Sequence, residues 1–218
     1  MTRSAFLRAR RPEHKEQRRQ AILDAARELA AASGVRNVSL GAVAEAVGLA
    51  KSNIVRYFGT REEIYLQLLT EEWHAWAAAV ADRLLPGPRP DAAEAVTALA
   101  ETLVARPLFC DLLSHNSTTL EHNVSVPAAH AFKRTVVGLI AELGARVAPA
   151  AGLTPTEAAE LVGAAAGLAG MLYPAANPSP TLAQVYAQDP ELAATCPPFL
   201  PTLVRALRAL AAGLPTLR

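Results

Sequence analysis

GLAKSNIVRYFGTREEIYLQLL, residues 48–69, is the stretch of sequence that decides the fold. Gly48 is the expected end of one helix, and a tight turn leads from it into a short helix predicted at 51–58. Thr60 and Glu63 then match a capping box, which predicts the start of a much longer helix. Isolated helices shorter than about 12–15 residues are marginal in water, so neighbouring helices must hold the short one. Two helices joined by a tight glycine turn predict a helix-turn-helix unit.

The short helix is expected to have one buried face and one exposed face. Ile54, Val55 and Phe58 are its apolar residues, and we expect them to pack on the two preceding helices. The opposite face carries side chains of the types that contact DNA, because Asn binds adenine, Lys and Arg bind guanine or phosphate, and Tyr binds phosphate. These residues are Lys51, Ser52, Asn53, Arg56 and Tyr57. An ordinary solvated helix face is the alternative interpretation.

Charge divides the chain into two predicted domains. Residues 1–66, here called the head, contain 12 Lys and Arg against 7 Asp and Glu, a net charge of +5. Residues 67–218, here called the body, contain 9 against 13, a net charge of −4. A basic head indicates a polyanionic partner. We predict a helix-turn-helix DNA-binding domain with a basic N-terminal extension at 1–66, and a helical effector-binding and dimerisation domain at 67–218.

The composition predicts an all-α fold. The chain is 51% hydrophobic but only 5% aromatic, and its commonest residues, Ala and Leu, are among the best helix formers. Runs of alternating Val, Ile and Thr, which strands would need, are absent from the sequence. Apolar periodicity and capping residues predict about nine helices, with a break at 86–90 and a Pro-rich connector at 177–198. The helices are expected at 12–33, 39–47, 51–58, 60–84, 91–105, 107–118, 125–147, 154–173 and 199–214.

Three features bear on the cellular compartment and on cofactors. The N-terminal segment is charged and lacks the apolar core of a signal peptide. The most apolar window, residues 161–176, is short of a membrane span and is expected to be a buried helix. Cys110 and Cys196 have no metal-site spacing, so we expect reduced thiols rather than a disulfide. The sequence predicts a cytoplasmic protein with no membrane partner, no metal and no cofactor.

Residues 18–66 resemble the DNA-binding head of the tetracycline-repressor (TetR) family. Three segments carry the likeness: AILDAARELAAASGVRNVSLGAVAEAVGLA, KSNIVRYF and GTREEIYLQLL. The resemblance implies that Ser39, Tyr57 and Arg61 contact phosphates. It also implies that Lys51, Ser52 and Asn53 face bases. The expected function is a ligand-responsive regulator, most often a repressor, that binds a palindromic DNA operator as a homodimer and is released by a small-molecule effector.

The head departs from the family pattern at two positions. Ala50 stands where the family has a capping side chain, which is expected to cost the recognition helix about 1 kcal/mol. Val55 stands where the family usually has Tyr, so one phosphate contact is expected to be missing. Arg56 or the basic N-terminal segment could supply that contact, although this segment could also be only a solubilising tail. Its basic residues are Arg8, Arg10, Arg11, Lys15, Arg18 and Arg19.

The body is expected to pair with a second copy of the chain. The helix at 154–173 places glycines on one side, which permits close helix approach, and the last helix carries leucines on one side. Two such helices from each subunit would form a four-helix bundle. The predicted interface residues are Gly163, Gly167, Gly170, Leu203, Leu207 and Leu210. The alternative is that these residues belong to the core of a single chain.

A ligand pocket is expected in the body, because residues 106–125 mix apolar and polar side chains as ligand sites do. The residues predicted from this segment are Phe109, Leu113, His115, Asn116, Glu121 and His122. Aromatic and apolar residues of other helices could complete the wall: Trp73, Trp76, Phe132, Met171 and Tyr173. For each aromatic residue, a place in the ordinary hydrophobic core is the alternative.

Two other function classes are open from the sequence. A helical-body enzyme or small-molecule-binding protein would use His115, Glu121 or His122, but no activated nucleophile or phosphate loop accompanies them. The two histidines are seven residues apart, which is only a weak metal-site spacing. A pure scaffold would leave the basic head unexplained.

Overall fold

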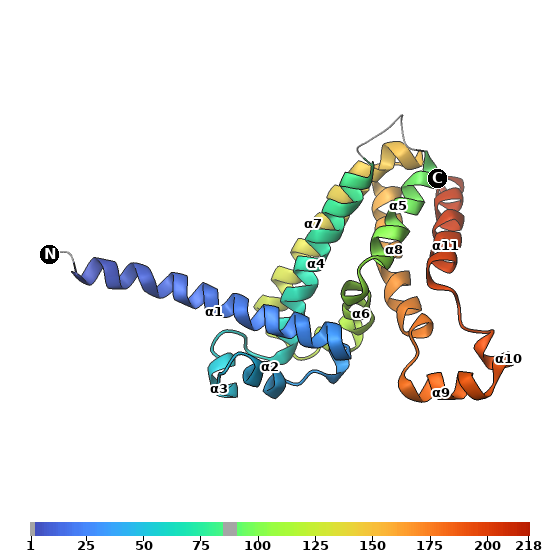
Figure 1. The fold of residues 1–218 in the computed structure, drawn as a ribbon. Helices are drawn as coiled ribbons and strands as arrows, with labels where there is room; N and C mark the ends of the chain where they lie inside the picture. The colour runs from blue at the N-terminus through green and yellow to red at the C-terminus, as the bar shows by residue number, and fades with distance from the viewer. Residues whose placement is uncertain (1–2, 85–90) are drawn as a thin grey trace.

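The computed structural model describes the backbone of residues 3–84 and 91–218, and the side chains of residues 13–84, 91–116 and 118–218. All regular structure in these ranges is helical, which confirms the all-α prediction (Figure 1). The predicted break at 86–90 lies outside the described residues. The α-helices are α1 (Arg3–Ser33), α2 (Leu40–Ala46), α3 (Lys51–Ile54), α4 (Arg61–Leu84), α5 (Ala92–Val104), α6 (Pro107–His115), α7 (Val126–Ala151), α8 (Pro155–Ala176), α9 (Pro180–Gln188), α10 (Pro190–Ala193) and α11 (Phe199–Gly213).

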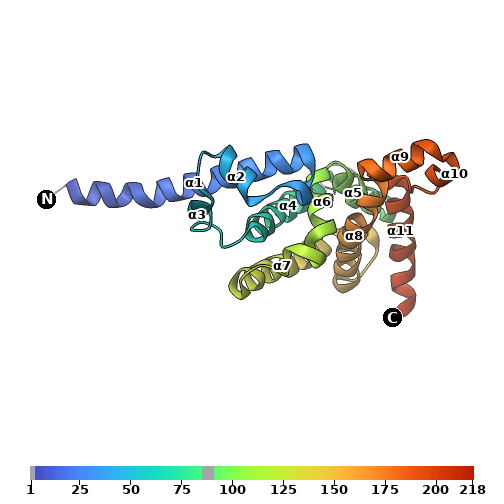
Figure 2. The same cartoon turned by 90° about the horizontal axis from the view of Figure 1, so that it is seen from below.

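The head and the body share one long helix. α1, α2 and α3 form the head at one end of the molecule, and α4 runs from the head along the length of the body (Figure 1). Seen from below, α7, α8 and α11 lie in a row on one side of the body (Figure 2). α9 and α10 lie together at the far corner from α1 (Figure 1).

The first helix is longer than the sequence predicted. α1 begins at Arg3 instead of residue 12, and its N-terminal half projects beyond the rest of the head (Figure 1). Its end is as expected: Gly34 has φ 84°, a left-handed conformation that favours glycine, and its N–H donates to Ala30 O at 2.8 Å. The 3₁₀ turn η1 (Val35–Asn37) follows and leads to α2.

Two body helices begin at complete capping boxes. The Asp91 carboxylate accepts from Glu94 N at 2.8 Å, and the Glu94 carboxylate accepts from Asp91 N at 3.3 Å. Thr154 and Glu157 make the same reciprocal pair at the start of α8, with the Pro155 ring at the first helical position. Each box satisfies backbone N–H groups that the helix itself leaves without partners, so these starts were predictable from local sequence.

The later helices differ from prediction at their C-terminal ends. α6 ends at His115, and the chain continues as the π turn η2 (Asn116–Leu120). α8 continues past Pro174 to Ala176, because a proline so close to a helix end removes only one hydrogen bond from the last turn. The Pro-rich connector, which was expected to hold one or two short turns, contains α9 and α10.

Close helix packing around α8 depends on glycine. A Cβ added to Gly144 of α7 would lie 2.7 Å from the backbone of Ala159 in α8. A Cβ added to Gly170 of α8 would lie 2.9 Å from the backbone of Leu113 in α6. The two glycines therefore let α8 approach both neighbouring helices at backbone distance.

Among the described helices, α8 is the one that is long and apolar enough to cross a membrane. Its buried residues pack against α6, α7 and α11.

The packing makes a testable difference between the two thiols. Cys110 is fully buried, its Sγ donates to Leu103 O at 3.3 Å, and burial raises its pKa to about 12. Cys196 is only partly buried. Because the thiolate is the reactive form, we expect one thiol per native chain to react quickly with a disulfide reagent, and both after unfolding. In Cys196→Ser the fast reaction should disappear, whereas Cys110→Ala should keep it; fast labelling of native Cys196→Ser would contradict the packing around Cys110.

Candidate nucleic-acid interface and head–body junction

The helix-turn-helix unit has the predicted geometry at its turn. Ser39 is exposed and caps α2, its Oγ accepting from Ala42 N at 3.1 Å. Gly48 has φ 64°, and the adjacent Leu49 N donates to Ala44 O at 2.9 Å. This left-handed residue reverses the chain between α2 and α3, which favours glycine at position 48.

α3 is shorter than the predicted helix. It is regular from Lys51 to Ile54, and Ala50 before it provides no side-chain cap. Beyond Ile54 the chain forms a turn, with Arg56 N donating to Asn53 O and Tyr57 N to Ile54 O. An uncapped helix of this length has few backbone hydrogen bonds of its own, so packing must hold it in place.

The buried face of α3 consists of fewer residues than expected. Ile54 is completely buried and Phe58 is 3% exposed, as predicted, but Val55 is 47% exposed. One step along a helix turns the side chain by about 100°, which carries Val55 away from the core contacted by Ile54. The prediction that Val55 docks on the preceding helices was therefore wrong.

The opposite face of α3 projects from the head. Lys51, Ser52, Asn53 and Arg56 are exposed, and Tyr57 is partly buried. A groove of about 420 Å³ separates this face from α1. Its lining includes three basic side chains, those of Lys15, Arg18 and Arg56, together with Asn53 and Tyr57. Lys15 and Arg18 of α1 thus line the same groove as Asn53, Arg56 and Tyr57, while the side chains of Arg8, Arg10 and Arg11 lie outside the described residues.

Two other arginines of the head are used internally. Arg19 donates to Tyr57 O and to the Gln67 side chain at 3.3 Å each, and its guanidinium lies 4.1 Å from the centre of the Phe58 ring. Arg61 donates from Nε to Val38 O at 2.5 Å and from a terminal nitrogen to Val35 O. These contacts link α1 and α4 to the turns of the head.

Arg61 makes further contacts within α4. Its remaining terminal nitrogen is 3.1 Å from the Glu62 carboxylate, and its guanidinium lies 4.7 Å from the centre of the Tyr65 ring. All three guanidinium nitrogens therefore have partners within the chain. The assignment of Arg61 to a DNA phosphate stays a prediction. The sequence did not announce the internal role of Arg61, because Val35 and Val38 precede it by more than twenty residues.

The first turn of α4 also holds the loop before α7. Thr60 Oγ1 donates to Asn123 O at 2.7 Å and accepts from Glu63 N at 3.1 Å. The Glu63 carboxylate accepts from Ser125 N at 3.0 Å and from Gly59 N at 2.9 Å. These bonds, that to Ser125 N first, lower the pKa of Glu63. The contact is therefore formed at neutral pH and is lost only as acid protonates the carboxylate.

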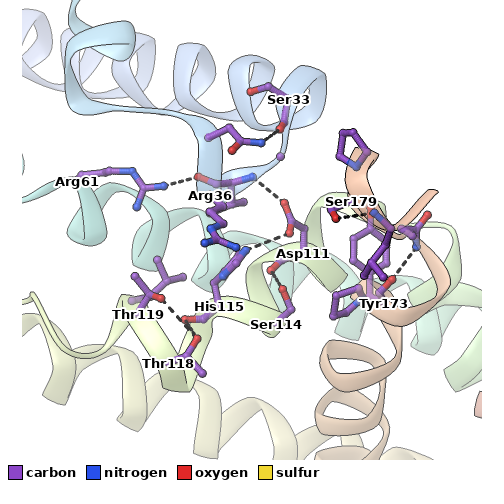
Figure 3. Close-up of a pocket in the computed structure, with 18 residues that line it drawn as sticks. Ser33, Arg36, Arg61, Asp111, Ser114, His115, Thr118, Thr119, Tyr173 and Ser179 are labelled. Atoms are coloured by element: carbon purple, nitrogen blue, oxygen red, sulfur yellow. Dashed lines mark hydrogen bonds and ion pairs between the residues drawn. The ribbon is translucent and has the colours of Figure 1, made fainter. Parts of the chain in front are cut away.

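α6 makes a further contact with the head. Asp111 accepts from Val35 N at 2.7 Å through one carboxylate oxygen, while the other lies 3.5 Å from His115 Nε2 (Figure 3). Arg61 binds the carbonyl of the same residue, Val35. The turn η1 is therefore anchored through both the N–H and the carbonyl of Val35. An ion pair between Arg27 of α1 and Glu71 of α4, at 2.6 Å, lies further along the same junction.

A cleft of about 1140 Å³ opens beside these contacts, and we call it the junction cleft (Figure 3). The end of α1, η1 and Arg61 line it on the head side. On the body side it is lined by α6, η2 and the corner between α8 and α9. It therefore lies between elements of both domains and not within the helices of the body.

Family models match nearly the whole chain. Residues 22–68 match the model described as bacterial regulatory proteins, tetR family, and residues 70–218 match the one described as tetracyclin repressor-like, C-terminal domain. The chain belongs to the TetR family of transcriptional regulators. The family predicted from the sequence is confirmed. The fold of this family is that of a ligand-responsive DNA-binding regulator rather than of an enzyme.

Solved structures with the same fold have low sequence identity to this TetR-family chain. The multidrug binding protein EbrR complexed with imidazole is 22% identical, with a TM-score of 0.55 over 88% of this chain and 94% of that one. A possible TetR family transcriptional regulator from Streptomyces coelicolor A3(2) is 23% identical, with a TM-score of 0.54 over 92% of this chain and 100% of that one. No curated protein matches the chain significantly.

Most aromatic residues predicted to line a pocket of this TetR-family regulator form its core. Trp73 packs edge-on against Trp76 and Phe109 with ring centres 5.4 Å apart in both pairs, and Trp76 Nε1 donates to Thr102 Oγ1 at 2.9 Å. Each of these rings is at most 4% exposed, and so is Phe132. Trp73, Trp76 and Phe109 fill the interior against each other, whereas Phe132 lines a separate cavity of about 280 Å³ between α1, α4 and α7. A ligand contact for these four residues stays a prediction.

The other predicted ligand residues are dispersed. His115 and Tyr173 line the junction cleft, whereas Leu113 packs against Gly170 and Met171 is exposed. Glu121 pairs with Lys133 at 2.6 Å, Asn116 is partly buried and His122 is exposed. The described side chains form no cluster that could hold a metal. Sequence reasoning missed Arg36 and Asp111, which line the same cleft only because the tertiary fold brings η1 to α6.

The predicted dimer residues fall into two groups. Leu203 and Leu207 are completely buried within the single chain, and Gly170 packs against Leu113, so their assignment to a subunit interface was wrong. By contrast, a Cβ added to Gly163 or Gly167 would meet nothing within 4 Å, and Leu210 is 37% exposed. Subunit contacts of these last three residues, on α8 and α11, stay a prediction.

The internal role of Arg61 can be tested by unfolding. Arg61→Ala leaves two backbone carbonyls without their donor and should reduce the free energy of unfolding by about 1–3 kcal/mol, measured by urea denaturation. Arg36→Ala, which changes an exposed arginine of the adjacent turn, is the matched control and should stay within about 0.5 kcal/mol of the wild type. If Arg61→Ala is as stable as the wild type but binds DNA more weakly, the result would support a phosphate contact for Arg61 instead of a structural role.

Proposed function

We propose that the protein is a homodimeric cytoplasmic repressor that binds a palindromic DNA operator and is released by a small-molecule effector. The observation that carries the proposal is the exposed polar face of α3, next to a groove lined by three basic side chains. α3 has no other evident reason to be so short and so exposed. A recognition helix in the major groove needs both properties.

Base reading is proposed for the first residues of α3. Lys51, Ser52 and Asn53 are exposed at its N-terminal end, the part of a recognition helix that reaches base edges. The amide of Asn53 suits adenine, and the ammonium of Lys51 suits guanine. The stem of Lys51 lies over Gly41 of α2, where an added Cβ would be 2.6 Å from Lys51 Cε. That packing directs the lysine without using its charge.

Phosphate binding is proposed for the residues that surround this face. Arg56 and Tyr57 follow α3, and Lys15 and Arg18 lie across the groove on α1. Ser39, exposed at the start of α2, is a further candidate. The basic residues of α1 would replace the contact that the family usually obtains from Tyr and that Val55 cannot make. In this arrangement, phosphate contacts from α1 position the protein on the duplex, and base contacts from α3 select the DNA sequence.

Dimerisation is proposed through the outer face of α8, assisted by α11. Gly163, Gly167 and Met171 recur every fourth residue and so share one side of α8. Both glycines face open space in the single chain, and Met171 is 63% exposed. Small residues followed by an exposed methionine allow a second α8 to approach closely, with Leu210 of α11 at the edge.

DNA reading is tested by selecting bound duplexes from random DNA. Asn53→Ala should lose the preference at one base pair of each half-site, a loss of about 1–3 kcal/mol of discrimination. Lys15→Ala should weaken binding to all duplexes and reduce the salt dependence by about one ion. Arg134→Ala, an exposed arginine of α7, is the control and should change neither. An unchanged motif and affinity for Asn53→Ala would refute base reading by α3.

The dimer surface is tested by sedimentation. In Gly167→Leu the added Cβ meets nothing within 4 Å in its own chain, and leucine favours helix more than glycine by about 1 kcal/mol, so each monomer should fold. The leucine should nevertheless separate the two subunits and lower operator affinity, because half-sites need two linked heads. Gly138→Leu places the same substitution on an open site of α7 and should leave the dimer intact. An intact Gly167→Leu dimer would exclude this face.

A further inference from the structure

The junction cleft lies where a bound molecule would touch both domains. Arg36 in η1 belongs to the head, and Ser114, Thr119 and Tyr173 belong to the body (Figure 3). Its volume of about 1140 Å³ is ample for a small organic molecule. The interior of the body is occupied by the aromatic cluster of α4 and α6, so the cleft is a better place for an effector than the predicted pocket.

The accessible charge in the junction cleft is positive. All three guanidinium nitrogens of Arg61 have partners within the chain, and the two oxygens of Asp111 lie 2.7 Å from Val35 N and 3.5 Å from His115 Nε2. Arg36 is exposed, and among the described side chains it takes part in no ion pair. Its guanidinium can therefore accept an anionic group without losing another bond.

One wall of the junction cleft is apolar. Tyr173 and Pro174 at the end of α8 meet Pro180 and Leu182 at the start of α9, and Leu182 is 45% exposed. Tyr173 is held from behind by Phe199, with ring centres 5.9 Å apart. An apolar wall opposite a free guanidinium suits a molecule with a hydrocarbon or aryl part and an acidic end.

We infer that the junction cleft is the effector site and that it binds an amphipathic organic acid. The acidic group binds Arg36, the apolar part lies on Tyr173 and Leu182, and the hydroxyls of Ser114 and Thr119 bind its other polar atoms. The inference rests on the proposed function, since it names the effector class and its place. It assigns the site to the junction of the domains and not to the interior of the body.

The same contacts explain how such a ligand acts on the head. Val35, the residue before Arg36, is bound through its N–H by Asp111 and through its carbonyl by Arg61. A displacement of Arg36 is therefore transmitted to α6 and α4 through these bonds, because η1 is not a free loop. An acid that bridges η1 and the α8–α9 corner favours one angle between head and body. When that angle does not fit the operator, DNA binding is weaker.

Binding is tested with anilinonaphthalene sulfonate, a fluorescent amphipathic organic anion. The dimer should show saturable binding that Arg36→Ala weakens at least about tenfold, as expected for the loss of a charged hydrogen bond. Leu182→Asp, a change at an exposed position of the apolar wall, should weaken it similarly. Arg134→Ala removes an equivalent exposed charge from α7 and should bind as the wild type does. Equal affinity in all four proteins would overturn the site.

Coupling is tested with the duplex selected by the wild type. Saturating anilinonaphthalene sulfonate should lower its affinity by about 5- to 150-fold in the wild type and much less in Arg36→Ala. If the probe binds through Arg36 while duplex affinity stays constant, the cleft is not the effector site. If the ligand-free protein selects no duplex at all, the proposed function fails, and the dependence of probe binding on Arg36 still decides whether the cleft is an anion site.

Discussion

The first turn of α4 fixes the geometry between the two domains. Thr60, Arg61 and Glu63 bind, respectively, the carbonyl of Asn123, the carbonyls of Val35 and Val38, and the N–H of Ser125. These partners come from segments before and long after α4, and each is a backbone group at the end of a helix or turn. Removing such a donor leaves a desolvated carbonyl, so the junction resists small changes of angle and transmits larger ones. The position of α3 relative to the body depends on this turn.

The body interior has the opposite character. Its buried residues, within the described ranges, are apolar, and glycines at 144 and 170 bring α7 and α6 to backbone distance from α8. Packing at this density resists local deformation, because each displaced ring or helix creates a void or an overlap. Polar side chains that line the junction cleft, such as Arg36 and Ser114, lie outside this packed interior. The body is thus held by apolar packing, and the junction by hydrogen bonds to backbone groups.

Prediction from the sequence succeeded where local rules act and failed where tertiary contacts decide. Gly48, Thr154 and the exposed Lys51 obey rules of turns, caps and helix faces that need only a few neighbouring residues. The internal bonds of Arg61 were not foreseen, because an arginine at a helix start looks the same whether its partner is a phosphate or a distant carbonyl. The core positions of Trp76 and Leu203 were not foreseen for a related reason: a ring or leucine that lines a pocket or an interface has the same periodicity as one that fills the core. The cleft beside Arg36 was missed because it exists only once η1 meets α6.

The brevity of α3 has a consequence for how this regulator can diverge. The helix gives the core one fully buried side chain, Ile54, while residues 51–53 are exposed. Exposed substitutions usually change stability by within about 0.5 kcal/mol. Sequence preference and folding are thus encoded by different residues of the same four-residue helix. A lineage that duplicates this gene can explore new binding sequences at 51–53 without risking the fold, and a library randomised at those three positions should consist mostly of folded proteins.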